Sequence, residues 1–248
     1  MKIIDLNCDL GEGAGHDGEL MPLIASANIA GGAHAGDEAT MRESVELALR
    51  HGVAIGAHPS FPDREHFGRR ELAASPVQIG QWVREQTHAL MKIAQAAGAR
   101  VTHVKPHGAL YNLAARDVTT ADAIAAAIKA CDERLILVGL SGSELPAAGL
   151  RAGLRVAHEV FADRAYHRDG TLVARTDGRA LMDDAAVAAE RMIGLLHTGK
   201  VRSVEGDEIA LQADTICLHG DGVHAVDFAR ELRRALAAAQ ISIKPLTV

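Results

Sequence analysis

The chain has 248 residues, of which 48% are apolar and 3% aromatic, with 26 basic and 32 acidic side chains and a net charge of −6. This length suits one large α/β domain, and the negative charge provides no basic surface for nucleic acid. With no apolar run near the ~18 residues that cross a bilayer, no signal-like N-terminus and three cysteines without CxxC spacing, we expect a soluble cytoplasmic protein with reduced thiols.

The first half of the chain alternates predicted strands and helices. Residues 3–10 alternate apolar and polar side chains, which predicts a strand whose polar face carries Asp5, Asn7 and Asp9. A second strand begins at Ser26 and runs out through glycines towards His34. The patterns also predict helices at 38–51 and 76–97 and strands at 53–58 and 101–107.

The second half continues the alternation. The patterns predict strands at 135–140, 155–161 and 215–219, and helices at 121–131, 144–153, 180–197 and 224–239. We expect Thr119 or Thr120 to cap one of these helices, and Ser141 has capping-box spacing to Glu144. The tail at 241–244 is a candidate eighth strand.

Seven strand–helix units predict a parallel α/β protein with right-handed crossovers. Strands 3–10 and 102–107 each carry polar groups on one face, which an open sheet covered by helices cannot solvate but a barrel lumen can. We therefore expect a single domain over residues 1–248, an incomplete seven-stranded (β/α) barrel with its site at the C-terminal mouth.

Titratable side chains stand at or just after the ends of the predicted strands. Because the carboxyl ends of parallel strands gather on one face, we expect these residues to converge in an active site. Burying so many charges without a function would be costly for each unpaired group. The residues are Asp9, His34, His58, Lys105, His107, Glu159, His219 and Asp221.

Metal binding is one interpretation of this set. Asp9 with His34 and His58, and with His107 as a further candidate, offers the oxygen and nitrogen ligands that a divalent metal prefers. No HExxH or CxxC spacing fixes the geometry, so a hydrogen-bonded acid/base cluster is the competing interpretation.

The basic residues near the strand ends also have two interpretations. Lys105 either steadies an oxyanion or phosphate, or pairs with Asp9 or Glu159. Arg69 and Arg70 are either an ordinary charged pair on a loop or a site for a carboxylate or phosphate.

Several segments, in this order along the chain, resemble the motifs of the LamB/YcsF family. They are Asp5–Gly13, Ser26–Ala30 with His34–Asp37, Gly56–Ser60, Phe67–Arg70, Val104–Asn112, Glu159–Tyr166 and Ile216–Asp221. The resemblance implies a barrel of the glycoside hydrolase/deacetylase type. It also implies ATP-dependent opening of 5-oxo-L-proline to L-glutamate, with separate 5-oxoprolinase B and C subunits as partners. We expect ATP to be the co-substrate, accompanied by Mg²⁺.

Within these motifs and strand ends we assign two groups of site residues. The catalytic candidates are Asp9, Lys105, His107, Glu159, His219 and Asp221. The candidates for binding substrate or ATP are Asn7, Glu12, Asn28, Arg69, Arg70, Tyr111, Asp163 and Arg164.

A lactam amide is a poor electrophile, so we expect ATP to phosphorylate the lactam oxygen before water attacks. Asp9 or Glu159 is the expected general base on water. Lys105 and Arg70 are expected to neutralise developing phosphate charge, and His107 or His219 to protonate the departing nitrogen.

Four positions depart from the family pattern. Gly31 and Ala33 replace the usual Cys and Phe, and Gly222 and Val223 replace Thr-Pro, which we expect to enlarge or loosen the mouth. Two other functions stay open from the sequence: a metal-dependent, deacetylase-like hydrolase of C–N bonds that needs no ATP, and a non-catalytic lactam- or carbohydrate-binding module.

Overall fold

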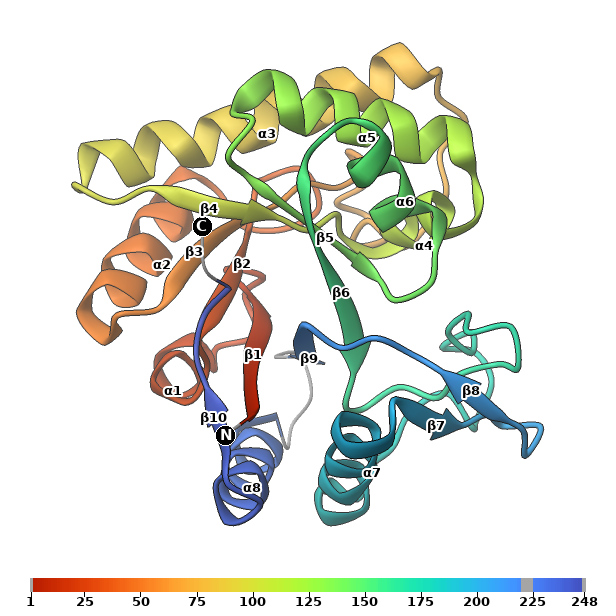
Figure 1. The fold of residues 1–248 in the computed structure, drawn as a ribbon. Helices are drawn as coiled ribbons and strands as arrows, with labels where there is room; N and C mark the ends of the chain where they lie inside the picture. The colour runs from red at the N-terminus through yellow and green to blue at the C-terminus, as the bar shows by residue number, and fades with distance from the viewer. Residues whose placement is uncertain (1, 220–224, 247–248) are drawn as a thin grey trace.

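The computed structural model describes residues 2–219 and 225–246, in which parallel strands form a barrel with helices around it (Figure 1). Strand β9 pairs with both β6 and β1, which closes a ring of seven strands and confirms the expected barrel. In order round the ring the strands are β1 (Lys2–Leu10), β2 (Ser26–Ala30), β3 (Ala54–His58), β4 (Val101–Val104), β5 (Ile136–Leu140), β6 (Arg155–Phe161) and β9 (Thr215–His219).

Helices pack on the outside of the ring, with α3 beside α5 and α7 beside α8 (Figure 1). Their apolar faces cover the outward-facing strand residues and form one large core. The helices are α1 (Asp17–Leu20), η1 (Met21–Leu23), α2 (Glu38–His51), α3 (Pro76–Ala96), α4 (Gly108–Arg116), α5 (Val118–Cys131), α6 (Glu144–Arg151), α7 (Ala185–Thr198) and α8 (Ala225–Ala238).

Capping residues mark the helix ends, and two of the caps differ from those that the sequence predicts. Gly52 ends α2 in the left-handed conformation, as expected. Helix α5 begins before the predicted threonine caps, because the side chain of Asp117 accepts from the backbone N–H of Thr120. Helix α6 has Ser143 as its N-cap without a side-chain bond, and Ser141 instead accepts from the N–H of Gln212.

Five further elements differ from the sequence pattern or extend it. Helix α4 does not follow from that pattern, and α7 begins at Ala185 rather than at 180. The charged turn before β9 is a hairpin of β7 (Lys200–Arg202) and β8 (Glu208–Ala210). The tail does form a strand, β10 (Ile241–Ile243), which pairs with the first residues of β1 outside the ring.

The barrel interior is polar near its C-terminal end, as the alternation in β1 predicts. Leu6 and Cys8 belong to the apolar core, whereas Asp5, Asn7 and Asp9 are buried with polar partners from other strands. Each of these three polar groups therefore has a hydrogen bond that offsets its desolvation.

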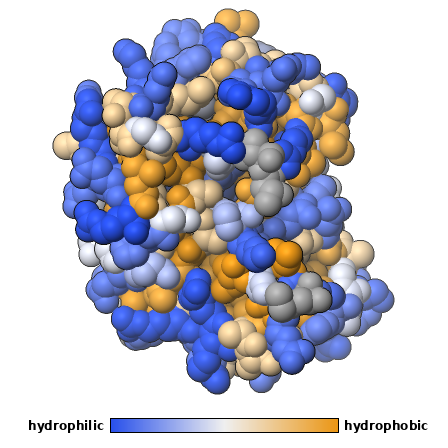
Figure 2. Space-filling view, turned by 60° about the vertical axis from the view of Figure 1, so that its left-hand side comes forward, coloured by the Kyte–Doolittle hydropathy of each residue, from blue (hydrophilic) through white to orange (hydrophobic). Residues whose placement is uncertain are grey.

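The face of the molecule drawn in Figure 2 is mostly hydrophilic. Figure 2 shows hydrophilic residues around separate apolar patches on the visible face. Exposed large apolar side chains come from different parts of the fold: Ile3, Leu49, Val77, Val118, Leu150, Leu181 and Val187. Among the helices of the described residues, none has both the length and the apolar character needed to cross a membrane.

Candidate active site at the barrel mouth

A cavity of about 450 Å³ opens at the C-terminal ends of the barrel strands. Its polar lining residues come from strand ends, from the loops that follow them and from helix α4: Asp9, Glu12, His58, Arg69, Lys105, His107, Tyr111, Asn112, Arg164, Arg175, Thr176 and His219. This is the place at which the sequence predicts convergence.

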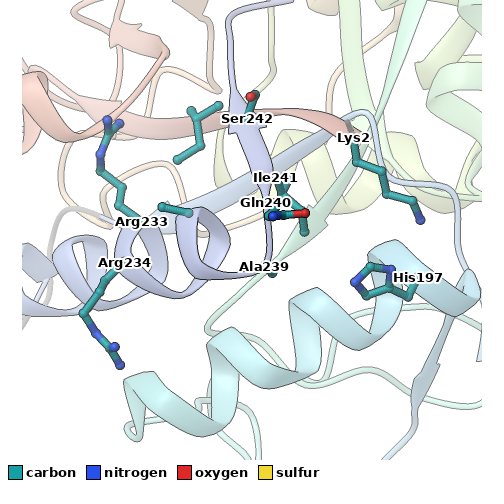
Figure 3. A pocket seen from close by; sticks show the side chains of 10 residues that line it. Lys2, His197, Arg233, Arg234, Ala239, Gln240, Ile241 and Ser242 are labelled. Carbon is teal, nitrogen blue, oxygen red and sulfur yellow. The ribbon is translucent and has the colours of Figure 1, made fainter.

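A larger cavity of about 1020 Å³ lies at the other end, where β1 and β10 begin (Figure 3). Lys2, His197, Arg233 and Arg234 line it, and no carboxylate stands among its described lining residues. Since this larger cavity offers no acid beside its basic residues, the cavity at the barrel mouth is the better candidate for catalysis.

Lys105 lies at the floor of the mouth cavity, directly after β4. Its Nζ donates to Asp9 Oδ1 and contacts Glu159 Oε1, each at 2.9 Å, and lies 3.0 Å from Cys217 Sγ. Although burial opposes the charge, the two carboxylates raise the pKa of Lys105 well above its ordinary value. Lys105 is therefore a permanent cation at the floor.

The two carboxylates beside Lys105 have different surroundings. Tyr111 donates its hydroxyl to Glu159 Oε2 at 2.6 Å, and Asn7 Nδ2 donates to Glu159 Oε1 at 3.0 Å, so Glu159 is enclosed with 0% exposure. Asn28 donates to Asp9 Oδ1 at 2.8 Å, yet Asp9 still lines the cavity. Asp9 is therefore the carboxylate that a bound molecule can reach.

Four residues form a second group, which we name the Glu12 cluster: Glu12, His34, His58 and His107. One ligand atom from each lies within 4.8 Å of the others, so the cluster is a possible metal-binding group. Glu12 Oε1 is 3.0 Å from His34 Nε2 and 3.1 Å from His107 Nδ1. The sequence placed Asp9 in this role, but Asp9 borders the cluster, with Oδ2 3.3 Å from His58 Nε2.

Burial and neighbouring charges determine the protonation of the cluster. Burial lowers the pKa of His34 to about 4 and lowers that of His107, so both are neutral near pH 7. Burial also opposes charge on His58, but Asp9 raises its pKa above the ordinary value. Bonds from His107 and His34 outweigh burial at Glu12 and hold its carboxyl pKa far below the usual range.

A third group lies on the β6–β9 side of the cavity. His219 Nδ1 donates to Asp163 Oδ2 at 2.7 Å, and the His219 ring stacks on Phe161. Arg164 lines the same wall, with its Nη2 donating to a backbone oxygen and its Nε buried without a hydrogen-bond partner. Arg175 also lines the cavity and is exposed.

Some predicted residues do not reach the cavity. Arg70 lies 3.6 Å from Asp63 and is absent from the described lining, whereas Arg69 is present. Neither Gly31 nor Ala33 lines the cavity, and a Cβ on Gly31 would lie 2.9 Å from the Cβ of Gln86. Gly31 and Ala33 therefore do not enlarge the cavity at the barrel mouth by direct contact with it. Asp221, Gly222 and Val223 lie outside the described residues.

The sequence analysis missed other residues that contact the site. Thr215 and Cys217 share the inward parity of His219 on β9, so the alternation of that strand was a usable signal. Phe67 contributes its carbonyl oxygen to His107, and Arg175 comes from a long irregular loop. No periodic pattern points to these last two residues.

Comparisons with known proteins cover nearly the whole chain. The model of the LamB/YcsF family matches residues 4–248. The chain is 50% identical to a Bacillus licheniformis protein named as the A subunit of 5-oxoprolinase, over 98% of both chains. A Tolumonas auensis protein of the same name is 48% identical, and the match covers 99% of this chain and 100% of the Tolumonas protein.

Solved structures agree with the fold. A lactam utilization protein from Thermus thermophilus has a TM-score of 0.93 and 45% identity, covering 99% of this chain and 100% of its own. A peptidoglycan deacetylase from Bacillus subtilis, at a TM-score of 0.50 and 16% identity, covers 98% of this chain and 87% of its own and is similar in fold alone. Because the family model matches residues 4–248 and the relatives are about half identical, the chain belongs to the LamB/YcsF family.

Proposed function

We propose that this chain opens the lactam ring of 5-oxo-L-proline to L-glutamate in an ATP-dependent reaction, as one component of a multi-subunit 5-oxoprolinase. The observation that carries the proposal is the buried contact of Lys105 with Asp9 and Glu159 at the floor of the cavity. Relatives at half identity over nearly their whole length, which bear the name of a 5-oxoprolinase component, support the choice of substrate.

The proposed chemistry begins with the lactam oxygen. Transfer of the terminal phosphoryl group of ATP, with Mg²⁺, to this oxygen makes the ring carbon a better electrophile. Water then adds to that carbon, the C–N bond breaks with a proton going to nitrogen, and a second water releases phosphate. The products are L-glutamate, ADP and phosphate.

Asp9 is the general base in this scheme. It lines the cavity, whereas Glu159 is enclosed by donors from Asn7 and Tyr111. Lys105 remains charged beside Asp9 and stabilises negative charge that develops on the lactam oxygen or phosphoryl group.

His219 is the acid that protonates the departing nitrogen. Its Nδ1–H is held by Asp163, which leaves Nε2 as the atom for proton transfer at the cavity wall. The guanidinium groups of Arg164, Arg175 and Arg69 line the same cavity and suit the carboxylate of 5-oxo-L-proline or a phosphate of ATP.

We infer that the complex also contains B and C subunits and works in the cytoplasm. The letter A in the relatives' names supports the presence of further subunits. The three cysteines of the chain are unpaired thiols, which suits a reducing compartment.

The test is an assay of glutamate release from 5-oxo-L-proline, with and without ATP, by the chain alone and mixed with candidate B and C subunits. We expect release only with ATP and the other subunits. Ligand binding without turnover in every mixture would favour a binding module. Asp9→Asn, assayed in the active mixture, should abolish turnover while a surface control, Asp122→Asn, retains it.

The Glu12 cluster favours a second candidate, a metal-dependent hydrolase of C–N bonds. Three imidazoles and a carboxylate suit a divalent ion that activates water without phosphorylation. Glutamate release by the isolated, metal-loaded chain in the absence of ATP would select this function over the first.

A further inference from the structure

The outer hydrogen bonds of two histidines fix the protons of the Glu12 cluster. His58 Nδ1 lies 2.7 Å from the backbone oxygen of Lys105, and His107 Nε2 lies 2.9 Å from that of Phe67. A carbonyl oxygen only accepts, so both of these nitrogens are donors. In the neutral rings, His58 Nε2 and His107 Nδ1 therefore carry lone pairs and no proton.

These lone pairs meet one another and a carboxylate. His107 Nδ1 is 3.0 Å from His58 Nε2 and 3.1 Å from Glu12 Oε1, and His34 Nε2 is 3.0 Å from the same oxygen. His58 Nε2, His107 Nδ1 and Glu12 Oε1 are acceptors that repel at these separations unless a proton or cation lies between them, whereas neutral His34 can donate its Nε2–H to Glu12. The spacing suits neighbouring ligands of one ion with bonds of about 2.0–2.2 Å.

The balance of charge in the site also calls for a cation near the Glu12 cluster. Asp9 and Glu159 are buried and the side chain of Glu12 is 7% exposed, and the described residues give these carboxylates only Lys105 as a permanent cation in contact. Two negative charges remain beside Lys105, and a divalent cation bound at the Glu12 cluster offsets both.

The loop behind the cluster is built to hold the histidines in place. Phe67 has a φ of +55°, which is unfavourable for a bulky residue, and in this conformation its carbonyl oxygen accepts from His107. A Cβ on the next residue, Gly68, would lie 2.2 Å from Ser60 Oγ and 2.9 Å from the Cβ of His34. Backbone carbonyls that orient imidazoles in this way are typical supports of metal ligands.

We propose that the Glu12 cluster binds one divalent transition-metal ion through three imidazole nitrogens and the Glu12 carboxylate. This ligand set suits Zn²⁺ and related ions. When bound, the ion supplies a Lewis acid next to Asp9. The inference goes beyond the proposed reaction, because metal binding needs neither ATP, 5-oxo-L-proline nor other subunits.

The experiment is a titration of the chelator-treated full chain with Zn²⁺ by calorimetry, with metal content measured after dialysis. We expect one ion per chain and a higher thermal transition with Zn²⁺ present. Glu12→Gln and His107→Gln should weaken binding at least about tenfold. His197→Gln, which changes an exposed histidine in the cavity at the other end (Figure 3), should bind like the unmodified chain.

Absence of stoichiometric binding by the folded chain would overturn the proposal, and so would unchanged affinity in folded Glu12→Gln and His107→Gln. Circular dichroism checks the folding of each variant. If both variants are unfolded, the Co²⁺ derivative of the unmodified chain decides. Visible ligand-field bands of nitrogen-ligated Co²⁺ support the site, and a spectrum of hexaaqua Co²⁺ rejects it.

Discussion

Lys105 Nζ lies 2.9 Å from Oε1 of Glu159, a carboxylate with no exposure to solvent. Removing the ammonium group leaves Glu159 and Asp9 buried without their cation. We predict that Lys105→Met abolishes turnover and lowers the free energy of unfolding by about 3–5 kcal/mol, measured by urea denaturation.

The double variant Lys105→Met/Glu159→Gln separates the two effects. Neutralising Glu159 should restore much of the lost stability, whereas turnover should stay absent because the cation is still missing. A double variant no more stable than Lys105→Met would contradict an electrostatic origin of the loss.

Asp5 gives a pH-dependent prediction. It accepts from Ser26 and Thr215, but burial raises its pKa from 3.8 to about 6. The folded state therefore keeps a proton that the unfolded chain loses between about pH 4 and pH 6, so stability falls as pH rises through this window. We predict that Asp5→Asn removes up to about 3 kcal/mol of this dependence.

Urea denaturation of the Asp5→Asn variant at about pH 4.5 and pH 7 measures that dependence. The difference in the free energy of unfolding, Asp5→Asn minus unmodified chain, should be more favourable to the variant at pH 7 than at about pH 4.5. The exposed Asp122→Asn should leave the profile unchanged, since Asp122 only pairs with Arg151 at the surface. Parallel profiles for Asp5→Asn and the unmodified chain would contradict the prediction.

Gly56 gives a packing prediction. A Cβ there would lie 2.0 Å from Nε2 of His103, the nitrogen that donates to Asn28 beside Asp9. We predict that Gly56→Ala costs about 1–3 kcal/mol or more and reduces turnover, because the shift of His103 reaches Asp9 through Asn28.

Gly80 is the matched control for that substitution. A Cβ on Gly80 in α3 meets nothing closer than 3.5 Å, so Gly80→Ala should be neutral or stabilise the helix by up to about 1 kcal/mol. Equal losses of thermal stability in the two variants would show that the close contact with His103 is not the cause.

Arg175 tests the anion-binding role of the cavity wall. It lines the cavity, and the described residues provide no hydrogen bond or ion pair for its guanidinium. We predict that Arg175→Ala raises KM for 5-oxo-L-proline or ATP about tenfold with little change in kcat, which corresponds to about 1.4 kcal/mol. Arg179→Ala, whose side chain pairs with Asp177, should keep the original KM. Steady-state kinetics of the reconstituted complex would refute the role if both variants behaved alike.

Much of the fold was predictable from local patterns. The period-two alternation of β1 identified the inward carboxylates, and histidines at strand ends identified the mouth of the barrel. Helix α4 was missed because it follows Pro106 and His107 with no separating turn signal.

The division of the site into groups was not predictable in the same way. The sequence pattern groups Asp9 with His34 and His58, whereas the structure places Glu12 among the histidines and Asp9 beside Lys105. Which carboxylate meets which base depends on the turn after β1, where Gly11 has a φ of +73°. Residue periodicity carries no information about such a turn.

The pairing of β1 also has a consequence for the synthesis of the protein. The first strand of the chain bonds to β9 and β10, with Asp5 opposite Thr215 and Lys2 opposite Ile241. One edge of β1 therefore has no partner until β9 and β10, more than 200 residues later, have left the ribosome. We expect ring closure to be a late step of folding, before which that edge is open to pairing with other nascent chains.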